Sequence, residues 1–225
     1  MPQTVLFIRH AQALHNTNSE FKKTLDPELT EEGKEQCIKL RDHLKEKLKD
    51  TKVDLIIVSP MQRALQTAMI GLDWLIEEQK VPVEANALWQ EIYDKPCDTG
   101  RPIPVLSQQF PLVDFSKVDP VWPDKTSIRA RLYRPTKTEV LARAEMAKED
   151  LQRRPERFII VVSHSGFMRK GLVGRCFANA DYRIFSLTEN EGFTEHGGME
   201  RGGMGRSEGE HVEIGSGLYD DELAT

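Results

Sequence analysis

Three groups of polar residues each come directly after a short apolar run of the sequence. The groups are Arg9 and His10 with Asn16, Ser59 with Arg63, and His164 between Ser163 and Ser165. Apolar runs of about four to eight residues are typical of buried strands. In open α/β sheets, ligands bind beyond the carboxyl ends of the strands, so groups that are distant in sequence can meet in one pocket. Glu91, which follows a further predicted strand, would join them.

Together these side chains are suited to the transfer of a phosphoryl group. The guanidinium groups of Arg9 and Arg63 match the oxygens of a phosphate in fork geometry. A neutral histidine can attack phosphorus, and a nearby carboxylic acid can protonate the leaving oxygen and then activate water. A second histidine and Asn16 can donate hydrogen bonds to the phosphoryl oxygens. The arginines supply the positive charge, so we predict no metal and no cofactor.

The elements that must position these residues alternate between strand and helix. Apolar runs predict strands at 4–8, 55–58, 81–89, 158–162 and 183–187. Apolar spacings of three and four residues predict helices at about 31–48, 60–79, 138–153 and 166–177. This alternation indicates an α/β fold of three layers, in which helices cover both faces of a mostly parallel central sheet.

Two stretches depart from that alternation. The segment from Tyr93 to Pro135 holds seven of the twelve prolines, and we interpret it as a lid inserted over one edge of the sheet. Eight of the fifteen glycines lie between Gly197 and Gly217, among few large apolar residues, which is typical of a flexible segment. We therefore predict one domain over residues 1–190, with the lid at about 93–135, and a flexible tail over 191–225.

Length and composition indicate a globular domain and exclude several classes of protein. The chain has 225 residues, of which 39% are hydrophobic and 30% are charged, and its net charge is −5. The mild acidity argues against a general nucleic-acid binder, and no apolar run is long enough to cross a bilayer. The three cysteines are far apart, so neither a disulfide framework nor a zinc site is indicated. We expect a reducing, cytoplasmic compartment.

Four stretches of the sequence resemble the motifs of a known family. Residues 7–16, FIRHAQALHN, resemble the signature of the histidine phosphatase superfamily, the phosphoglycerate-mutase-like enzymes, and 59–68, SPMQRALQTA, resemble its second motif. Residues 88–91, LWQE, resemble its acid-bearing segment, and 162–166, VSHSG, the segment with the second histidine. Order and approximate spacing agree over roughly residues 4–187, and four motifs together are specific. The resemblance implies a phosphoglycerate-mutase-like fold.

The resemblance also implies a role for each matching residue. His10 would be the nucleophile that becomes a phosphohistidine, and Glu91 would be the general acid and base. The phosphoryl oxygens would be bound by Arg9, Arg63, His164 and Asn16. Two positions depart from the family pattern. Ala11 stands where the family commonly has glycine. Ser165 and then Gly166 follow His164, so the sequence does not determine which backbone contact is made there.

These inferences predict a metal-independent phosphatase, a histidine acid–base enzyme that hydrolyses a small phosphate monoester through a phosphohistidine on His10. Two alternatives stay open. One is a phosphomutase of the phosphoglycerate mutase type. The other is a family member recruited to non-phosphatase chemistry or to the binding of a phosphorylated ligand. The expected partner is a small phosphorylated molecule, with neither nucleic acid nor membrane.

A second set of residues could contact the substrate outside the phosphoryl group. It consists of His15, Cys97, Thr99, Gly100, Arg101 and Ser165. His15 is expected at the rim of the pocket because it adjoins Asn16. The stretch from Cys97 to Gly100 also fits a simple turn with glycine at a positive φ, and the lid arginines also fit a solvated surface.

Overall fold

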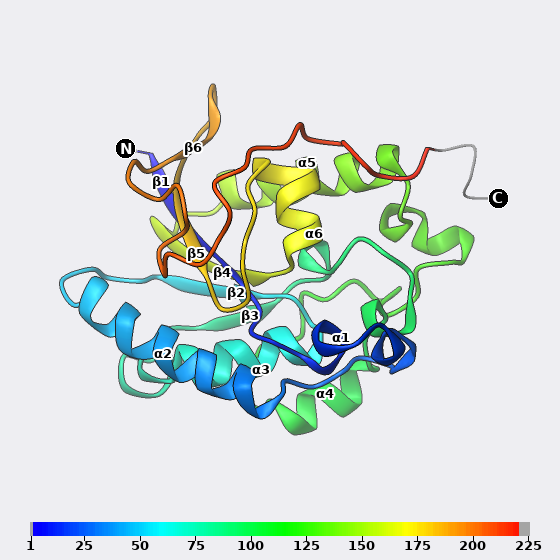
Figure 1. Cartoon of the computed structure of the whole chain (residues 1–225), viewed down its shortest axis with the longest axis horizontal. Coiled ribbons are helices and arrows are strands. Elements are labelled where there is room, and N and C mark those ends of the chain that lie inside the picture. Colours follow the sequence, from blue (N-terminus) through cyan, green and yellow to red (C-terminus); the bar gives the residue numbers. More distant parts are fainter. Residues whose placement is uncertain (1, 221–225) are drawn as a thin grey trace.

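The computed structural model describes residues 2–220 and places one sheet between two layers of helices (Figure 1). The strand order is β3-β2-β4-β1-β5-β6. The strands are β1 (Gln3–Arg9), β2 (Leu55–Val58), β3 (Val83–Ala85), β4 (Phe158–Ser163), β5 (Tyr182–Thr188) and β6 (Gly192–Glu195). Strands β1 to β4 are parallel, whereas β5 and β6 are antiparallel to their neighbours. The predicted α/β fold with a mostly parallel sheet is confirmed.

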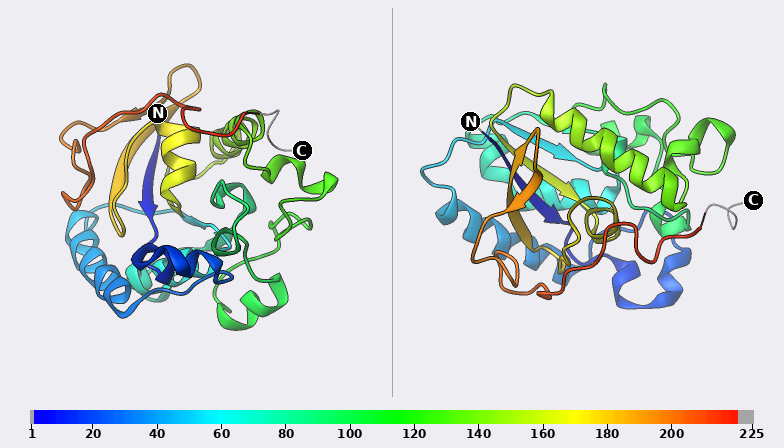
Figure 2. Two further views of the ribbon diagram at one scale, coloured as in Figure 1. Left: turned by 45° about the vertical axis from the view of Figure 1, so that its right-hand side comes forward. Right: turned by 90° about the horizontal axis from the view of Figure 1, so that it is seen from above.

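Helices cover both faces of this sheet. They are α1 (Leu14–Thr17), α2 (Glu31–Lys47), α3 (Gln62–Gly71), α4 (Ile103–Gln109), α5 (Lys137–Gln152) and α6 (Ser165–Phe167). One side carries α2 and α3, and the other carries α5 and α6 (Figures 1 and 2). Successive side chains of β1 point to opposite faces of the sheet, so this strand contributes to both hydrophobic cores. Leu6 and Ile8 pack with α2 and α3, whereas Val5 and Phe7 pack with α5. A strand buried on both faces needs apolar residues throughout, which explains the unbroken apolar runs of the sequence.

The strand predicted over residues 81–89 is much shorter in the structure. It spans only Val83–Ala85, and a 3₁₀ turn follows at Ala87–Trp89. Asn86 ends the strand, because its side-chain oxygen Oδ1 accepts a hydrogen bond from the backbone N of Leu88 at 2.9 Å. Such a local bond competes with the sheet and starts a turn. After this turn, the residues that follow lie at the carboxyl ends of the strands.

Two predicted helices also differ from their sequence patterns. The helix expected over 60–79 begins at Gln62 and ends at Gly71, after which Trp74–Glu78 forms a wider helical turn. The helix expected over 166–177 is a short α6 continued by a wide turn over Met168–Val173. Gly174, with φ of 66°, ends it in the left-handed conformation that favours glycine.

The segment interpreted as a lid, residues 93–135, runs along the β3 edge of the sheet. Asp114 donates from its backbone N to Val83 O at 2.8 Å, and Ala85 N donates to Asp114 O at 2.9 Å. Within the segment, Trp122 Nε1 donates to Arg101 O at 2.9 Å, which joins its two halves. Because an uncovered edge strand can pair with other chains, this backbone pairing also protects β3.

The glycine-rich tail returns from β6 past α6 toward α5 (Figure 2). Val212 N donates to Gly174 O at 2.8 Å, and Gly215 N donates to Lys170 O at 2.7 Å. The segment for which the sequence predicts flexibility is therefore attached to the wide turn after α6. The last part of the predicted tail, residues 221–225, lies outside the described residues.

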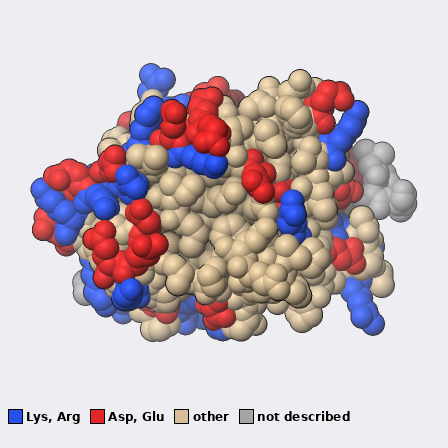
Figure 3. Space-filling model, turned by 90° about the horizontal axis from the view of Figure 1, so that it is seen from below, with Lys and Arg blue, Asp and Glu red and all other residues tan. Residues whose placement is uncertain are grey.

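The face that carries α2 and α3 has charges of both signs. Seen from below, Lys, Arg, Asp and Glu gather toward the end over α2, and the centre of the face is mostly uncharged (Figure 3). Over the described part of that face there is no continuous basic surface of the kind that binds a nucleic-acid backbone. Within residues 2–220, no helix combines the length and the apolar character needed to span a bilayer.

Candidate active site

The parallel pairing of β1 and β4 brings two histidines together. In their register Arg9 lies opposite Ser163, so the residues that follow, His10 and His164, leave the sheet side by side. Their ring centroids are 5.1 Å apart, and both rings are buried. Arg63, in the first turn of α3, donates from Nε to Nε2 of His10 at 3.2 Å. The fold thus gathers residues from three distant stretches at one edge of the sheet.

The neighbours of His10 hold its ring in one protonation state. Nδ1 lies 2.7 Å from the carbonyl oxygen of Ala11, which can only accept, so Nδ1 carries the proton. Nε2 accepts from Arg63 and therefore carries the lone pair. Burial, followed by the charges of Arg63 and Arg9, holds the pKa of His10 well below its usual value. At neutral pH His10 is an uncharged imidazole whose lone pair is on Nε2.

Two guanidinium groups lie near this ring, that of Arg63 fully buried and that of Arg9 half-buried. Arg63 donates from Nη1 to Cys97 O at 2.6 Å and from Nη2 to Asp98 Oδ1 at 3.0 Å. Arg9 donates from Nη1 to Phe177 O at 2.8 Å. Burial lowers the pKa of Arg9 to about 10, so its side chain stays cationic at neutral pH. These contacts orient two positive charges near His10, in a chain whose net charge is −5.

His164 adds a further hydrogen-bonding group beside the first histidine. Its Nε2 lies 2.8 Å from Oγ of Ser59. That oxygen accepts from Met61 N at 3.4 Å, so its own proton is free to be donated to His164. Nδ1 of His164 is buried and finds no hydrogen-bond partner within residues 2–220. With Nε2 accepting, Nδ1 carries a proton that a phosphoryl oxygen could accept.

Glu91 reaches the same edge of the sheet from the turn that follows β3. Its Oε1 accepts from Ile92 N at 2.9 Å, and its Oε2 accepts from Gly166 N at 3.2 Å. Burial, and then the charge of Asp98, raises the pKa of Glu91, so its protonated form persists to higher pH than usual. A Cβ at Gly166 would collide with this carboxyl group. The backbone contact left open in the sequence analysis is therefore a hydrogen bond to Glu91.

Two buried cations that the sequence analysis missed hold the segment around Glu91. Lys125 donates from Nζ to Glu91 O at 2.8 Å and to Tyr93 O at 2.7 Å. Arg143 donates from Nη1 to Gln90 O at 2.8 Å. Burial lowers the pKa of Lys125 to about 7 and that of Arg143 to about 10. The backbone around Glu91 is thus fixed by hydrogen bonds from two elements, the lid and α5.

One of these two cations had a signal in the sequence. Arg143 lies one turn after Val140 and next to Ala144, on the face of α5 that packs against the sheet. A charged residue on the apolar face of an amphipathic helix is unusual, because its charge must find a buried partner. Its position in the sequence could therefore have marked Arg143 as a buried cation. Lys125 has no such signal, because it stands in an irregular part of the lid between Asp124 and Thr126.

His15 lies beside His10, and the side chain of the neighbouring Asn16 is already partly engaged in hydrogen bonds. Its Oδ1 accepts from Ala13 N at 3.0 Å, and its Nδ2 lies 3.2 Å from Nε2 of His15. The His15 ring centroid is 5.7 Å from that of His10, and burial lowers the pKa of His15 to about 3. Asn179, which the sequence analysis missed, donates from Nδ2 to the carbonyl oxygen of His10 at 3.0 Å.

The lid residues proposed as substrate contacts differ in where their side chains lie. Cys97 meets the pocket through its carbonyl, which accepts from Arg63. Thr99 donates from Oγ1 to Lys95 O at 3.1 Å, and Arg101 donates from its backbone N to Asp26 at 3.2 Å. A Cβ at Gly100 would collide with the ring of Trp122, so this glycine permits close packing inside the lid. Ser165 begins α6 directly after His164.

The fold and the cluster of buried polar residues at the carboxyl ends of its strands define a phosphoglycerate-mutase-like α/β protein. Residues 5–174 match the family described as the histidine phosphatase superfamily, branch 1, and the chain belongs to that superfamily. This confirms the resemblance drawn from the four motifs.

Curated relatives agree with this membership. The chain is 34% identical over 166 residues to a Schizosaccharomyces pombe protein named "Probable phosphatase", a match that covers 72% of this chain and 74% of that protein. It is 30% identical over 204 residues to a "Phosphoglycerate mutase-like protein" of Arabidopsis thaliana, which covers 74% of this chain and 72% of that protein.

Solved structures share the fold. The alpha-ribazole phosphatase of Shigella flexneri matches with a TM-score of 0.53 at 19% identity, over 86% of this chain and 94% of that chain. A mycobacterial glucosyl-3-phosphoglycerate phosphatase matches with a TM-score of 0.52 at 18% identity, over 86% of this chain and 97% of that chain. At these identities the likeness concerns the fold alone.

Proposed function

We propose that this protein hydrolyses a small phosphate monoester, without a metal ion, through a phosphohistidine on His10. The observation that carries the proposal is the protonation state of His10. Its Nδ1 donates to Ala11 O at 2.7 Å, and the lone pair on Nε2 faces the guanidinium of Arg63. A neutral imidazole is a nucleophile, and the adjacent cation attracts the phosphoryl group that it would attack. The name of the S. pombe relative supports the same activity.

In the first step, Nε2 of His10 forms a bond to phosphorus while the bond between phosphorus and the ester oxygen breaks. The electron pair of that bond leaves with the ester oxygen. The protonated form of Glu91, which burial favours by raising the pKa of this carboxyl group, donates its proton to that oxygen, so an alcohol departs. The products of the step are a phosphohistidine and the Glu91 carboxylate.

In the second step, the Glu91 carboxylate accepts a proton from water, and the water oxygen attacks phosphorus. The bond between phosphorus and Nε2 breaks, and its electron pair returns to His10. Inorganic phosphate leaves, and Glu91 is protonated again. Arg9, Arg63 and the Nδ1 proton of His164 would stabilise the charge on the phosphoryl oxygens in both steps.

The direct test is to trap the covalent intermediate. Rapid quench of the enzyme with a ³²P-labelled aryl phosphate into alkaline detergent, followed by alkaline electrophoresis, should show label on protein that is lost in acid and stable in base. The label should be absent from His10→Ala. It should persist in His196→Ala, because His196 is an exposed histidine whose Nε2 contacts Ser186 Oγ. No label on the wild type, or equal label on His10→Ala, would contradict the proposal.

The same assay separates hydrolysis from the alternatives kept open by the sequence. A phosphatase releases inorganic phosphate, whereas a phosphomutase returns the label to an organic acceptor. A protein that only binds phosphorylated ligands forms no phosphoenzyme with any ester. Hydrolysis should continue in excess EDTA and should be inhibited by vanadate, which imitates the five-coordinate phosphorus of the transition state.

A further inference from the structure

A cavity of about 240 Å³ lies beside the proposed phosphoryl pocket. Its wall includes Arg9 and Ser165, the residues that stand directly before His10 and directly after His164. Arg169, on the wide turn after α6, forms another part of the wall, and Arg206 completes it from the glycine-rich tail. The cavity therefore shares a residue with the proposed phosphoryl pocket and draws the others from α6 and the tail.

The tail segment that carries Arg206 is built into the core. The carboxylate of Asp181, which is fully buried, accepts from Arg206 N at 3.2 Å and from Ser207 N at 2.9 Å. Ser207 donates from Oγ to the same carboxylate at 2.7 Å, and its Oγ accepts from Ala178 N at 2.9 Å. These bonds hold the backbone of residue 206 against the loop between α6 and β5. Arg206 is thus presented at the cavity by anchored backbone.

The charges around this cavity are unbalanced. Arg169 and Arg206 form no ion pair with any residue of the described range 2–220, and Nε of Arg169 is buried without a hydrogen-bond partner there. The side chain of Arg9 donates to a neutral group, the carbonyl oxygen of Phe177. Three guanidinium groups near one cavity repel one another, and an anion between them would relieve that repulsion.

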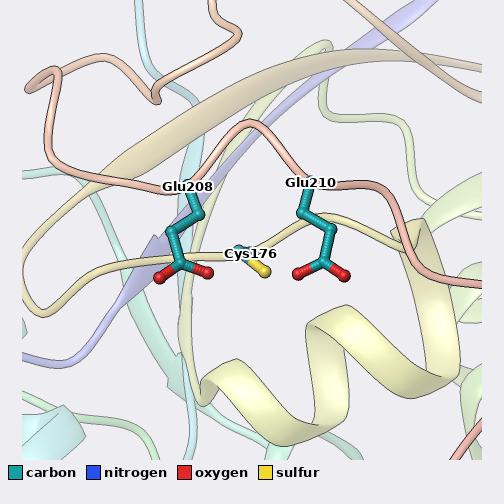
Figure 4. A group of neighbouring side chains, drawn as sticks. All are labelled: Cys176, Glu208 and Glu210. Atoms are coloured by element: carbon teal, nitrogen blue, oxygen red, sulfur yellow. The ribbon is translucent and has the colours of Figure 1, made fainter.

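The acidic residue at the cavity, Glu208, does not pair with these arginines. Its carboxylate groups instead with Cys176 and Glu210, and one ligand atom from each lies within 4.8 Å of the others (Figure 4). Both glutamates are exposed, and exposed acidic groups of this kind are common without an ion. We assign no cation to this group of three. Among the described residues, Glu208 lines the same cavity but forms no ion pair with Arg169 or Arg206.

We propose that this cavity is a subsite for a second anionic group of the substrate, a carboxylate or a second phosphate. The inference rests on the proposed function, because the subsite is defined by its closeness to the phosphoryl pocket. Guanidinium groups bind both kinds of oxyanion in fork geometry. The volume suits one such group with a few connecting atoms. The substrate class is then a small phosphate ester that carries a second negative charge, and the tail contributes to its selection.

The test compares matched esters that differ in one charge. The probes are phenyl phosphate, the three isomeric carboxyphenyl phosphates, and their neutral carbamoyl counterparts. In the variants Arg169→Gln and Arg206→Gln, kcat/KM should fall at least tenfold more for the best carboxyphenyl ester than for its carbamoyl counterpart. The comparison of variant with wild type cancels differences in leaving-group reactivity. Arg201→Gln is the control, because Arg201 is exposed in the same tail but does not line the cavity.

Each outcome decides between the proposals. If both variants lose activity equally on charged and neutral esters, the subsite is overturned, while hydrolysis of phenyl phosphate still supports the proposed function. If Arg201→Gln changes the charge preference as much as Arg206→Gln, the effect is one of general surface charge, and the subsite is again overturned. If the wild type hydrolyses none of the esters, the proposed function fails and the subsite fails with it.

Discussion

Arg63 donates from Nε to Nε2 of His10 across 3.2 Å, and this bond joins a fully buried cation to the atom proposed to attack phosphorus. The bond has two consequences. Burial and, after it, the charge of this cation keep the pKa of His10 low, because a charged imidazole would be poorly solvated and would be repelled by Arg63. It also marks where a phosphoryl group would sit, since the same guanidinium can turn to its oxygens when they arrive.

Replacing Arg63 with lysine keeps the positive charge but removes the planar guanidinium group, which can donate two parallel hydrogen bonds to a phosphoryl group. We expect kcat/KM to fall by about a hundredfold to a thousandfold, the range seen when one transition-state donor is lost. Asp98 would also lose the Nη2 bond that now spans 3.0 Å. Steady-state kinetics with phenyl phosphate measures the loss, and the exposed Arg153→Lys serves as control. Equal kinetics for the two variants would remove Arg63 from the proposed site.

Glu91→Gln should slow the hydrolysis of esters whose leaving group needs a proton more than that of esters whose leaving group does not. A simple alkyl phosphate should lose about a hundredfold to ten-thousandfold in rate, because general acid catalysis is worth that much for a basic leaving group. A 4-nitrophenyl ester, whose phenolate leaves unprotonated, should lose far less in its first step. Burst kinetics isolates that step. The exposed Glu145→Gln is the control, and an equal loss on both esters would argue against an acid role.

The pH dependence of kcat/KM follows from the raised pKa of Glu91. The protonated form is present below that pKa and is lost as pH rises through it, so activity should fall on the alkaline side of the profile. The Glu91→Gln variant should lack that limb. A profile in which the limb survives the substitution would assign it to another group.

Lys125→Met tests whether the lid positions Glu91. The variant leaves two carbonyl oxygens, of Glu91 and Tyr93, without their donor, and we expect a loss of about 1–3 kcal/mol in the free energy of unfolding. Removing the cation should also raise the pKa of Glu91 and move the alkaline limb of kcat/KM to higher pH. Denaturant unfolding and pH profiles measure the two effects. Lys117→Met, on an exposed lysine of the same lid, should show neither.

Asp26 should make stability depend on pH in a narrow window. Burial raises the pKa of this carboxyl to about 6, against 3.8 for its usual value, although the charges of Arg63 and Arg101 act in the opposite direction. The folded state therefore holds a proton that the unfolded state releases between these values. Stability is greatest below pH 3.8 on this account and falls by about 3 kcal/mol as pH rises through 6.

The comparison with Asp26→Asn isolates that contribution. The variant cannot titrate at this position, so the free energy of unfolding of wild type relative to the variant should fall between pH 3.8 and 6. Loss of one acceptor, for Gln62 N or Arg101 N, adds a constant cost that pH does not change. Urea unfolding at a series of pH values measures the difference. A difference that stays flat over the window would contradict the raised pKa.

Much of the fold was predictable because it depends on local pattern. Thr30 begins α2 by accepting from Gly33 N at 3.0 Å, as an N-cap threonine before an amphipathic repeat indicates. The apolar strands β1 and β4 were recognisable because a strand covered on both faces needs apolar residues at every position. Element ends were less predictable. Asn86 shortens β3 through one side-chain bond, whose effect competes with the pattern around it.

By itself, the sequence determined the alternation of strands and helices, the family membership, and the placing of His10 and His164 after their strands. Each of these depends on residues close together in the chain or on motif spacing. Only the tertiary structure decided the surroundings of the charged groups. It buried Lys125 against the segment that carries Glu91, directed Arg63 from α3 to His10, and brought Arg206 from the tail to the cavity that Arg9 also lines. Whether a charged side chain is buried depends on which distant segments pack around it. The periodicity of the local sequence does not indicate which segments those are.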